Sequence, residues 1–314
     1  MSSDAQLPKP LQVLLTRLAR GECVLIDGAT GTELDRRGAT MDQEAWCAVA
    51  TLTHPELLRT IHEDYIRAGA QLITSNTYAN SGAMLTAAGR AGEVGELTQR
   101  AVDIALEARE QCRAGDEVVV AGSMSHMAPV NPGSQGRDWS RVPEQAKWQA
   151  YLHETAQALA ASGVDLLLME MMHDPVMAPL AIEAARETGL PLWIGYSAKA
   201  GEAGPVACSY PDMRFAEMVE RAPPTAAQVC GIMHSPPEIS GAALEVLRGF
   251  TDMPLMVYPD SGQFEMPHWN FSTVISEAAF VDWCLQWRDT GVQVFGGCCG
   301  LGLTHIEALA KHIR

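Results

Sequence analysis

Two adjacent cysteines stand between glycines in the segment Gly296-Gly297-Cys298-Cys299-Gly300, directly after an apolar run. Glycines permit backbone angles and close approaches that other residues forbid, so a metal ion and a substrate could both reach the two sulfur atoms. Two buried free cysteines in a hydrophobic core are the simpler explanation of an isolated pair. The flanking glycines instead favour a thiol binding site at the end of a strand.

The cysteine pair follows the last of eight short apolar segments, most of them separated by stretches with helical spacing. Apolar segments without alternation are typical of strands buried on both faces. Eight such units predict an α/β protein with a (β/α)₈ barrel as a single domain over residues 1–314, after a helical lead-in over about residues 1–20. The eight predicted strands are residues 23–27, 71–76, 117–122, 165–170, 191–197, 227–233, 255–260 and 292–296.

A doubly wound open sheet is the alternative fold for such a pattern. That fold usually has fewer strands, and its first strand is followed by a glycine-rich loop that binds a dinucleotide. The corresponding segment here, Asp27-Gly-Ala-Thr-Gly-Thr, does not match the motif of that loop. The barrel is therefore the preferred prediction.

Parallel strands of a barrel end on one rim, where active sites of this fold lie. His234, Cys298 and Cys299 there would make a set of three zinc ligands that leaves a fourth position open for a thiol substrate. A lone histidine after a strand is more often a surface or hydrogen-bonding residue than a metal ligand. Asp27 or Glu170 alone could cap a helix N-terminus. Convergence on one rim argues for a site. The rim residues are Asp27, Asn76, Glu170, His234, Asp260, Cys298 and Cys299.

The chain has 38 acidic and 22 basic residues, and its net charge of −16 disfavours nucleic acid and anionic membranes as partners. No apolar run is long enough for a membrane span, and no basic region followed by an apolar one begins the chain. The eight cysteines are too scattered for a disulfide framework. We therefore expect a cytoplasmic protein with thiols or metal ligands, and formation of a homo-oligomer stays open.

Three of the connections that follow predicted strands are long and rich in Gly, Pro and Ser. They cover residues 126–142, 198–213 and 261–273. Loops of this length inside a compact domain are usually functional. We expect them to shape the substrate site.

The ordered set of motifs resembles the homocysteine S-methyltransferase family, which includes the betaine and S-methylmethionine enzymes and a module of methionine synthase. The resemblance covers nearly the whole chain. It rests on Leu25-Ile-Asp-Gly-Ala-Thr-Gly-Thr-Glu-Leu, Trp46, His54-Pro-Glu-Leu-Leu, His62-Glu-Asp-Tyr-Ile-Arg-Ala-Gly-Ala, Thr74-Ser-Asn-Thr-Tyr, Gly163-Val-Asp-Leu-Leu-Leu-Met-Glu, Tyr258-Pro-Asp-Ser-Gly and Gly296-Gly-Cys-Cys-Gly.

The resemblance implies a barrel enzyme that binds Zn²⁺ through three residues, two of which match Cys298 and Cys299. The third family ligand is a cysteine, and its position falls on His234 in this sequence. Cys230, four residues earlier, is the other candidate, but it would break the spacing to Pro236. His234 is preferred, and the change from thiolate to imidazole leaves open that the acceptor differs.

The resemblance also implies roles for the substrate residues. Glu170 and the segment Asp27-Gly28 would engage the amino-acid end of homocysteine, and Glu170 and Asp27 are the predicted catalytic residues. Trp46 would lie near a cationic methyl donor, which a ring face stabilises. The remaining predicted substrate contacts are Asn76, Tyr258 and Asp260.

The predicted reaction is transfer of a methyl group from a cationic onium donor to the thiolate of homocysteine, which gives methionine. Ala79 stands where betaine enzymes have a tyrosine, so a sulfonium donor such as S-methylmethionine is favoured over betaine. A methyltransferase with another thiol acceptor or donor is the first alternative. A thiol-redox barrel without methyl transfer and a non-catalytic binding protein are the others, and a corrinoid carried by a partner protein stays open.

Overall fold

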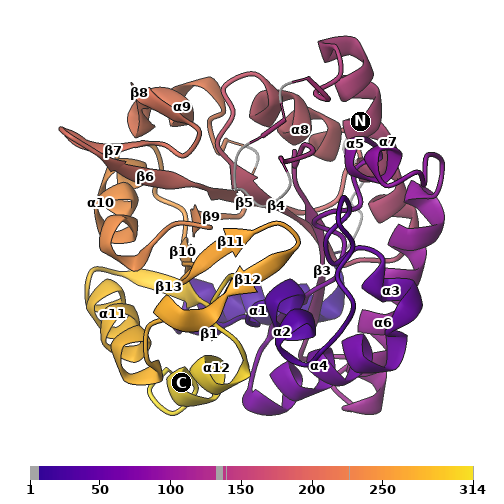
Figure 1. Cartoon of the computed structure of the whole chain (residues 1–314). Coiled ribbons are helices and arrows are strands. Elements are labelled where there is room, and N and C mark those ends of the chain that lie inside the picture. The colour runs from indigo at the N-terminus through magenta and orange to yellow at the C-terminus, as the bar shows by residue number, and fades with distance from the viewer. Residues whose placement is uncertain (1–6, 132–136, 139, 226, 314) are drawn as a thin grey trace.

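The computed structural model describes residues 7–131, 137–138, 140–225 and 227–313. Eight parallel strands lie side by side in the order β1-β13-β10-β9-β5-β4-β3-β2. A parallel bridge between Ile26 and Leu72 joins the first strand of this order to the last, so the sheet closes on itself. The predicted (β/α)₈ barrel is confirmed (Figure 1).

All eight predicted strands are present, and their side chains are buried almost without exception, as non-alternating apolar segments require. The barrel strands are β1 (Val24–Leu25), β2 (Leu72–Thr74), β3 (Val119–Met124), β4 (Leu166–Met172), β5 (Leu192–Tyr196), β9 (Val229–Met233), β10 (Leu255–Tyr258) and β13 (Val292–Phe295).

Helices surround the barrel (Figure 1). The helix over residues 55–68 shows why the sequence folds this way: Pro55 occupies its first turn, where a missing N–H costs nothing, and Gly69 ends it with φ +109°. The helices are α1 (Lys9–Ala19), α2 (Thr30–Arg36), α3 (Ala50–Thr53), α4 (Pro55–Ala68), α5 (Gly82–Ala87), α6 (Val94–Gln111), α7 (Gln145–Ala161), α8 (Met177–Arg186), α9 (Phe215–Arg221), α10 (Pro237–Arg248), α11 (Glu277–Asp289) and α12 (Leu303–Leu309), with the 3₁₀ helix η1 (Phe271–Thr273).

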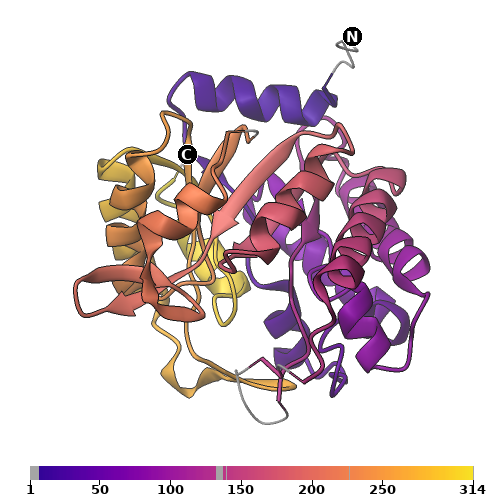
Figure 2. The same cartoon turned by 90° about the horizontal axis from the view of Figure 1, so that it is seen from above.

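The predicted lead-in over about residues 1–20 contains the helix α1, and residues 1–6 lie outside the described part of the chain. Helix α1 extends across one end of the barrel, opposite the end that carries the hairpin over residues 263–270 (Figure 2). Leu11, Leu14 and Leu18 bury the apolar side of α1. No helix in the described ranges has the length and hydropathy to cross a membrane.

Two of the three long connections contain secondary structure of their own. The connection after β5 forms the antiparallel strands β6 (Ala198–Gly201), β7 (Gly204–Ala207) and β8 (Tyr210–Arg214). The connection after β10 forms the hairpin of β11 (Gln263–Glu265) and β12 (His268–Asn270). These strands are short and largely exposed. Because their sequences lack the apolar runs of the barrel strands, they were not predicted. Of the connection after β3, residues 132–136 and 139 lie outside the described part.

Candidate active site

The cysteine pair sits in a turn after β13 that the chain holds from several sides. The Cys298 N–H donates to the Pro259 carbonyl at 2.7 Å, and the Cys299 carbonyl accepts from the Ser261 N–H at 2.9 Å. Gly300 has φ +82°, and a Cβ there would lie 1.9 Å from the Ser261 carbonyl oxygen. This turn therefore requires glycine at position 300, and it presents both thiols on the rim.

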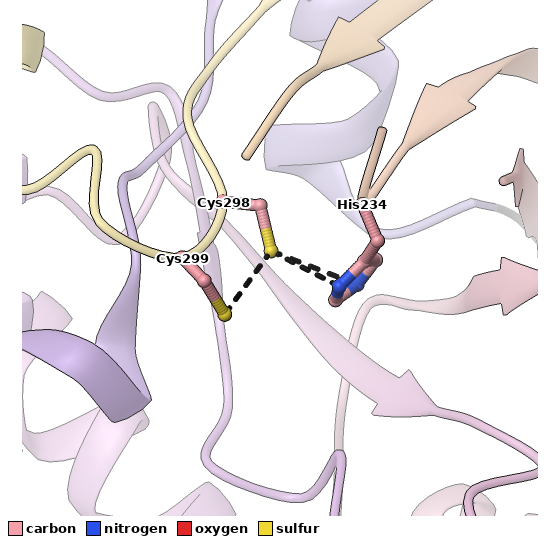
Figure 3. A group of neighbouring side chains, drawn as sticks. All are labelled: His234, Cys298 and Cys299. Carbon is pink, nitrogen blue, oxygen red and sulfur yellow. Dashed lines mark hydrogen bonds between the residues drawn. The ribbon is translucent and has the colours of Figure 1, made fainter. Parts of the chain in front are cut away.

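His234 follows β9 and faces the thiol pair (Figure 3). Its φ of +46° lies in the left-handed region, which a non-glycine residue adopts at a cost of roughly 1 kcal/mol. The Cys298 sulfur lies 3.2 Å from Nδ1 and 3.7 Å from Nε2 of His234. The two sulfur atoms of Cys298 and Cys299 are 3.7 Å apart. One ligand atom from each of the three residues fits within 4.8 Å of the others.

This cluster of His234, Cys298 and Cys299 fits a zinc ion. Zinc bound tetrahedrally by two thiolates at about 2.3 Å each separates the sulfurs by about 3.8 Å, close to the distance here. Among the described residues it is the one group of at least three His, Cys, Asp or Glu side chains gathered so closely. The alternative ligand Cys230 is buried within β9 and is not part of the cluster.

Glu170, in β4, supports the imidazole from behind. Its Oε2 lies 2.9 Å from Nε2 of His234, and both side chains are nearly buried. A ligating histidine commonly donates its second ring N–H to a carboxylate, which fixes the ring and its tautomer. With Nε2 engaged by Glu170, Nδ1 is the nitrogen left for a metal.

Burial raises the pKa of the Cys298 thiol well above its ordinary value, and the neighbouring Cys299 adds to this effect. The buried Cys298 thiol is therefore neutral unless a cation is close. Metal binding requires loss of the thiol protons. Burial disfavours the thiolate form, whereas the positive charge of a bound metal ion would favour it.

Two cavities meet at the cluster. The inner one is small and is lined by Trp46, Asn76, Glu170, Tyr258 and both cysteines, among others. The outer one encloses about 270 Å³, and Trp46, Tyr78, His234 and Cys299 border both. A ligand in each cavity would meet the other beside the thiols, as a transfer between two molecules requires.

The outer cavity has an aromatic wall, which sequence analysis located only at Trp46. The Trp46 ring makes edge-to-face contacts with Tyr78 and Phe264, and Tyr78 stacks on the His234 ring with centroids 5.2 Å apart. Phe264 and Trp269 come from the β11–β12 hairpin. The sequence did contain a signal for this wall, because Phe264 and Trp269 stand within the Gly- and Pro-rich connection over residues 261–273.

Asp27 and Gly28 line neither of these two cavities. The Asp27 carboxylate is fully buried and accepts hydrogen bonds from the Thr74 N–H, the Thr74 hydroxyl and the Tyr258 hydroxyl. Burial raises the pKa of Asp27 to about 8 against the effect of those donors. In this structure Asp27 holds Tyr258, which itself lines the inner cavity.

The other predicted contacts lie on the walls. Asn76 lines the inner cavity and donates from Nδ2 to the Cys47 carbonyl and the Thr51 hydroxyl. Asp260 lines the outer cavity, and burial raises its pKa. The structure thus brings Trp46, Asn76, Glu170, Tyr258 and Asp260 around the cluster.

The family model described as "Homocysteine S-methyltransferase" matches residues 24–313. The chain belongs to the homocysteine S-methyltransferase family. It is therefore a methyltransferase, and the predicted family is confirmed. The match spans all eight barrel strands, including the ends that carry His234, Cys298 and Cys299.

Relatives in this family align over nearly the whole chain. The selenocysteine Se-methyltransferase of Brassica oleracea is 30% identical over 93% of this chain and 89% of its own length. Homocysteine S-methyltransferase 2 of Arabidopsis thaliana is 29% identical over 93% of each chain. The metallated form of the homocysteine methyltransferase MmuM from Escherichia coli superposes with a TM-score of 0.72 at 26% identity, over 96% of this chain and 99% of that one.

Proposed function

We propose that this family member transfers a methyl group from a cationic onium donor to the thiolate of homocysteine and that it uses zinc to do so. The meeting of the two cavities beside Cys299 and His234 is the observation that carries this proposal. The relatives named for homocysteine methylation and the metallated MmuM structure support it. The product would be methionine.

His234, through Nδ1, and the two cysteines would hold the zinc ion. Bound there, zinc would lower the pKa of an acceptor thiol so that it is a thiolate near neutral pH. Two thiolates and a neutral imidazole leave a more positive ion than three thiolates would, since the ligand charge is −2 rather than −3. Among the described residues, no lysine or arginine lines the inner cavity, so no basic side chain there could activate a thiol in place of a metal ion.

The reaction is an in-line displacement. A bond forms between the acceptor sulfur and the methyl carbon, and the bond from that carbon to the donor heteroatom breaks, with its electron pair leaving on the donor. The aromatic wall would stabilise the onium cation, and catalysis would come from holding the two reactants in line.

Glu170 would have two roles in this arrangement. It holds His234 through Oε2, and it also lines the inner cavity, where a carboxylate complements the ammonium group of an amino-acid acceptor. Tyr258, held by Asp27, and Asn76 would complete that wall. A sulfonium donor is favoured over betaine, as the sequence indicated.

A different acceptor is the second candidate. His234 at the position of the family cysteine and the similarity to a selenocysteine Se-methyltransferase favour testing other thiols and selenols. The family match disfavours the redox alternative. We expect the protein in the cytoplasm, where its free cysteines stay reduced.

The test combines product and metal analysis. The purified protein is incubated with homocysteine and a donor that carries a deuterated methyl group, and the label is followed by mass spectrometry; cysteine and selenocysteine are the alternative acceptors. Metal content is measured in the native chain, Cys298→Ser and His234→Ala, purified without chelator. Labelled methionine and loss of zinc in both variants support the proposal, whereas zinc retained in both variants refutes the ligand assignment.

A further inference from the structure

The family motif that begins at Leu25 extends past Asp27-Gly28 into α2, and its later residues have no part in the proposed methyl transfer. Two side chains of α2, Thr32 and Arg36, form hydrogen bonds with the backbone of the cysteine turn (residues 298–301), which carries both thiols. Arg36 and its partner in the turn are 264 positions apart along the chain. The fold therefore brings α2 into direct contact with the backbone beside the thiol pair.

Thr32 holds the peptide group between Cys299 and Gly300. The Gly300 N–H donates to Oγ1 of Thr32 at 3.0 Å. The carbonyl at the other end of that peptide group, on Cys299, accepts from the Ser261 N–H at 2.9 Å. Because a peptide group is planar, bonds at both of its ends fix its orientation, and with it the backbone that directly follows the Cys299 thiol.

Arg36 holds the next peptide group, between Gly300 and Leu301. Its Nη2 donates to the Gly300 carbonyl at 2.8 Å, and the Leu301 N–H donates to the Cys298 carbonyl at 3.0 Å. The guanidinium also lies over the Phe271 ring, with Cζ 4.6 Å from the ring centroid, where the face of the ring attracts a cation. Side chains of α2 thus hold the peptide groups on both sides of the Gly300 Cα.

Glu33 holds Arg36 in this position. Its Oε2 accepts from Nη1 of Arg36, while its Oε1 accepts from Nε of Arg37 at 2.8 Å. The ion pair of Glu33 and Arg36 packs against Gly302, where a Cβ would lie 2.2 Å from Nη1 of Arg36 and 2.3 Å from Oε2 of Glu33. Glycine at position 302 therefore leaves the space that this pair occupies.

The cysteine turn needs such restraint because glycine adopts left-handed and right-handed backbone angles at similar cost. Gly300 allows the turn through its φ of +82°, but glycine by itself does not select that angle. Neither Thr32 nor Arg36 lines the inner or the outer cavity, so each acts through the backbone rather than on a substrate.

We infer that Thr32 and Arg36 are positioning residues for the cysteine pair. They hold the cysteine turn so that both thiols have the spacing that a zinc ion needs before the ion binds. The part of this inference that concerns zinc rests on the proposed function.

Zinc affinity tests the inference without reference to turnover. Competition with a chromophoric chelator gives the affinity of Thr32→Val and Arg36→Met for zinc. We expect each variant to bind zinc about threefold to tenfold more weakly than the native chain, which corresponds to the net strength of one hydrogen bond. Thr32→Ser keeps the hydroxyl and should restore native affinity, whereas a defect that Thr32→Ser shares would contradict a role for the hydroxyl.

Hydrogen–deuterium exchange of the chelator-treated chains tests the positioning role in the absence of metal. Peptides that contain the cysteine turn, followed by mass spectrometry, should exchange roughly fivefold faster in Thr32→Val and in Arg36→Met than in the native chain. Arg37 keeps the Glu33 carboxylate paired when Arg36 is replaced, so Arg36→Met leaves no buried carboxylate without a partner.

Arg109→Met and Thr188→Val are matched controls for a general loss of stability. Arg109 donates to the Val118 carbonyl and to a carboxylate, and Thr188 accepts from the Leu190 N–H, so these variants lose the same kinds of contact elsewhere in the chain. Both should keep the native zinc affinity and the native exchange of the cysteine turn.

Unaltered zinc affinity in both Thr32→Val and Arg36→Met overturns the inference, and so does a loss of affinity that the two controls share. If the native chain binds no zinc, the proposed use of zinc is refuted, and the exchange rates alone decide the positioning role. Faster exchange of the cysteine turn in both variants then supports that role, whereas native exchange in both overturns it.

Discussion

Glu170 Oε2 lies 2.9 Å from Nε2 of His234, while Nδ1 of the same ring lies 3.2 Å from the Cys298 sulfur. The Cys298 sulfur also lies 3.7 Å from Nε2, so the thiol is nearer to Nδ1, whereas the carboxylate contacts Nε2. Because Glu170 engages Nε2, Nδ1 is the ring nitrogen that remains for a ligand beside the cysteine pair. The same contact also ties a residue expected to contact the acceptor to the positioning of a metal ligand.

Glu170→Gln should weaken zinc binding about 10–100-fold, the usual effect of removing a carboxylate that orients a ligating histidine. Competition with a chromophoric chelator measures the affinity without relying on activity. Glu245→Gln changes an exposed glutamate on α10 and should leave the affinity unaltered. Native-like zinc affinity in Glu170→Gln would show that Glu170 serves the acceptor alone.

Zinc should stabilise the folded chain, because the cluster of His234, Cys298 and Cys299 exists only when the chain is folded. Free zinc at 100 times its Kd would add about 2.7 kcal/mol to the free energy of unfolding, which for a chain of this size is a rise in Tm of roughly 5 °C. Thermal melts with and without chelator measure the shift. It should vanish in Cys298→Ser/Cys299→Ser and persist in Cys112→Ser, and a shift retained in the double variant would place the zinc elsewhere.

Gly300→Ala should destabilise the chain by about 3 kcal/mol or more, because its new Cβ would clash with the Ser261 carbonyl in addition to straining a left-handed backbone. Gly189 has a similar φ of +74° but open space around it. Gly189→Ala therefore isolates the backbone strain, with an expected cost of about 1 kcal/mol. Urea unfolding of both variants gives the difference, and equal costs would mean that the turn around Cys299 tolerates a side chain.

The buried His62 should make stability fall at acid pH. Burial lowers the pKa of His62 from 6.5 to about 4, so the unfolded chain takes up a proton here before the folded chain does. The contribution of the neutral His62 to the free energy of unfolding is complete above pH 6.5. It is lost as the pH falls toward 4, by at most about 1.4 kcal/mol per pH unit. Urea unfolding between pH 7 and pH 4.5 should show a weaker pH dependence for His62→Leu than for the native chain.

The exposed His312 provides the control for that experiment. His312→Leu should keep the pH dependence of the native chain. If His62→Leu and the native chain lose stability in parallel as the pH falls, the buried imidazole is not a source of acid sensitivity.

The positions of the eight strands along the chain and the residues at their rim ends could be predicted from the sequence alone. Apolar runs such as residues 165–170 and 292–296 recur without alternation, and this local pattern is enough to predict parallel strands buried on both faces. Parallel strands end on one rim, so His234, Glu170 and the cysteine pair were expected to converge. Family membership could be recognised for the same reason, since its motifs lie at those strand ends.

Only the tertiary structure decided how those residues meet. The pairing of Glu170 with Nε2 of His234 and the burial of Asp27 behind Tyr258 depend on side chains from different strands approaching within a few ångströms. Spacing along the chain carries no information about such contacts. The hairpin that brings Phe264 over Trp46 was missed as secondary structure, because its short, exposed strands lack the apolar period that marks a barrel strand.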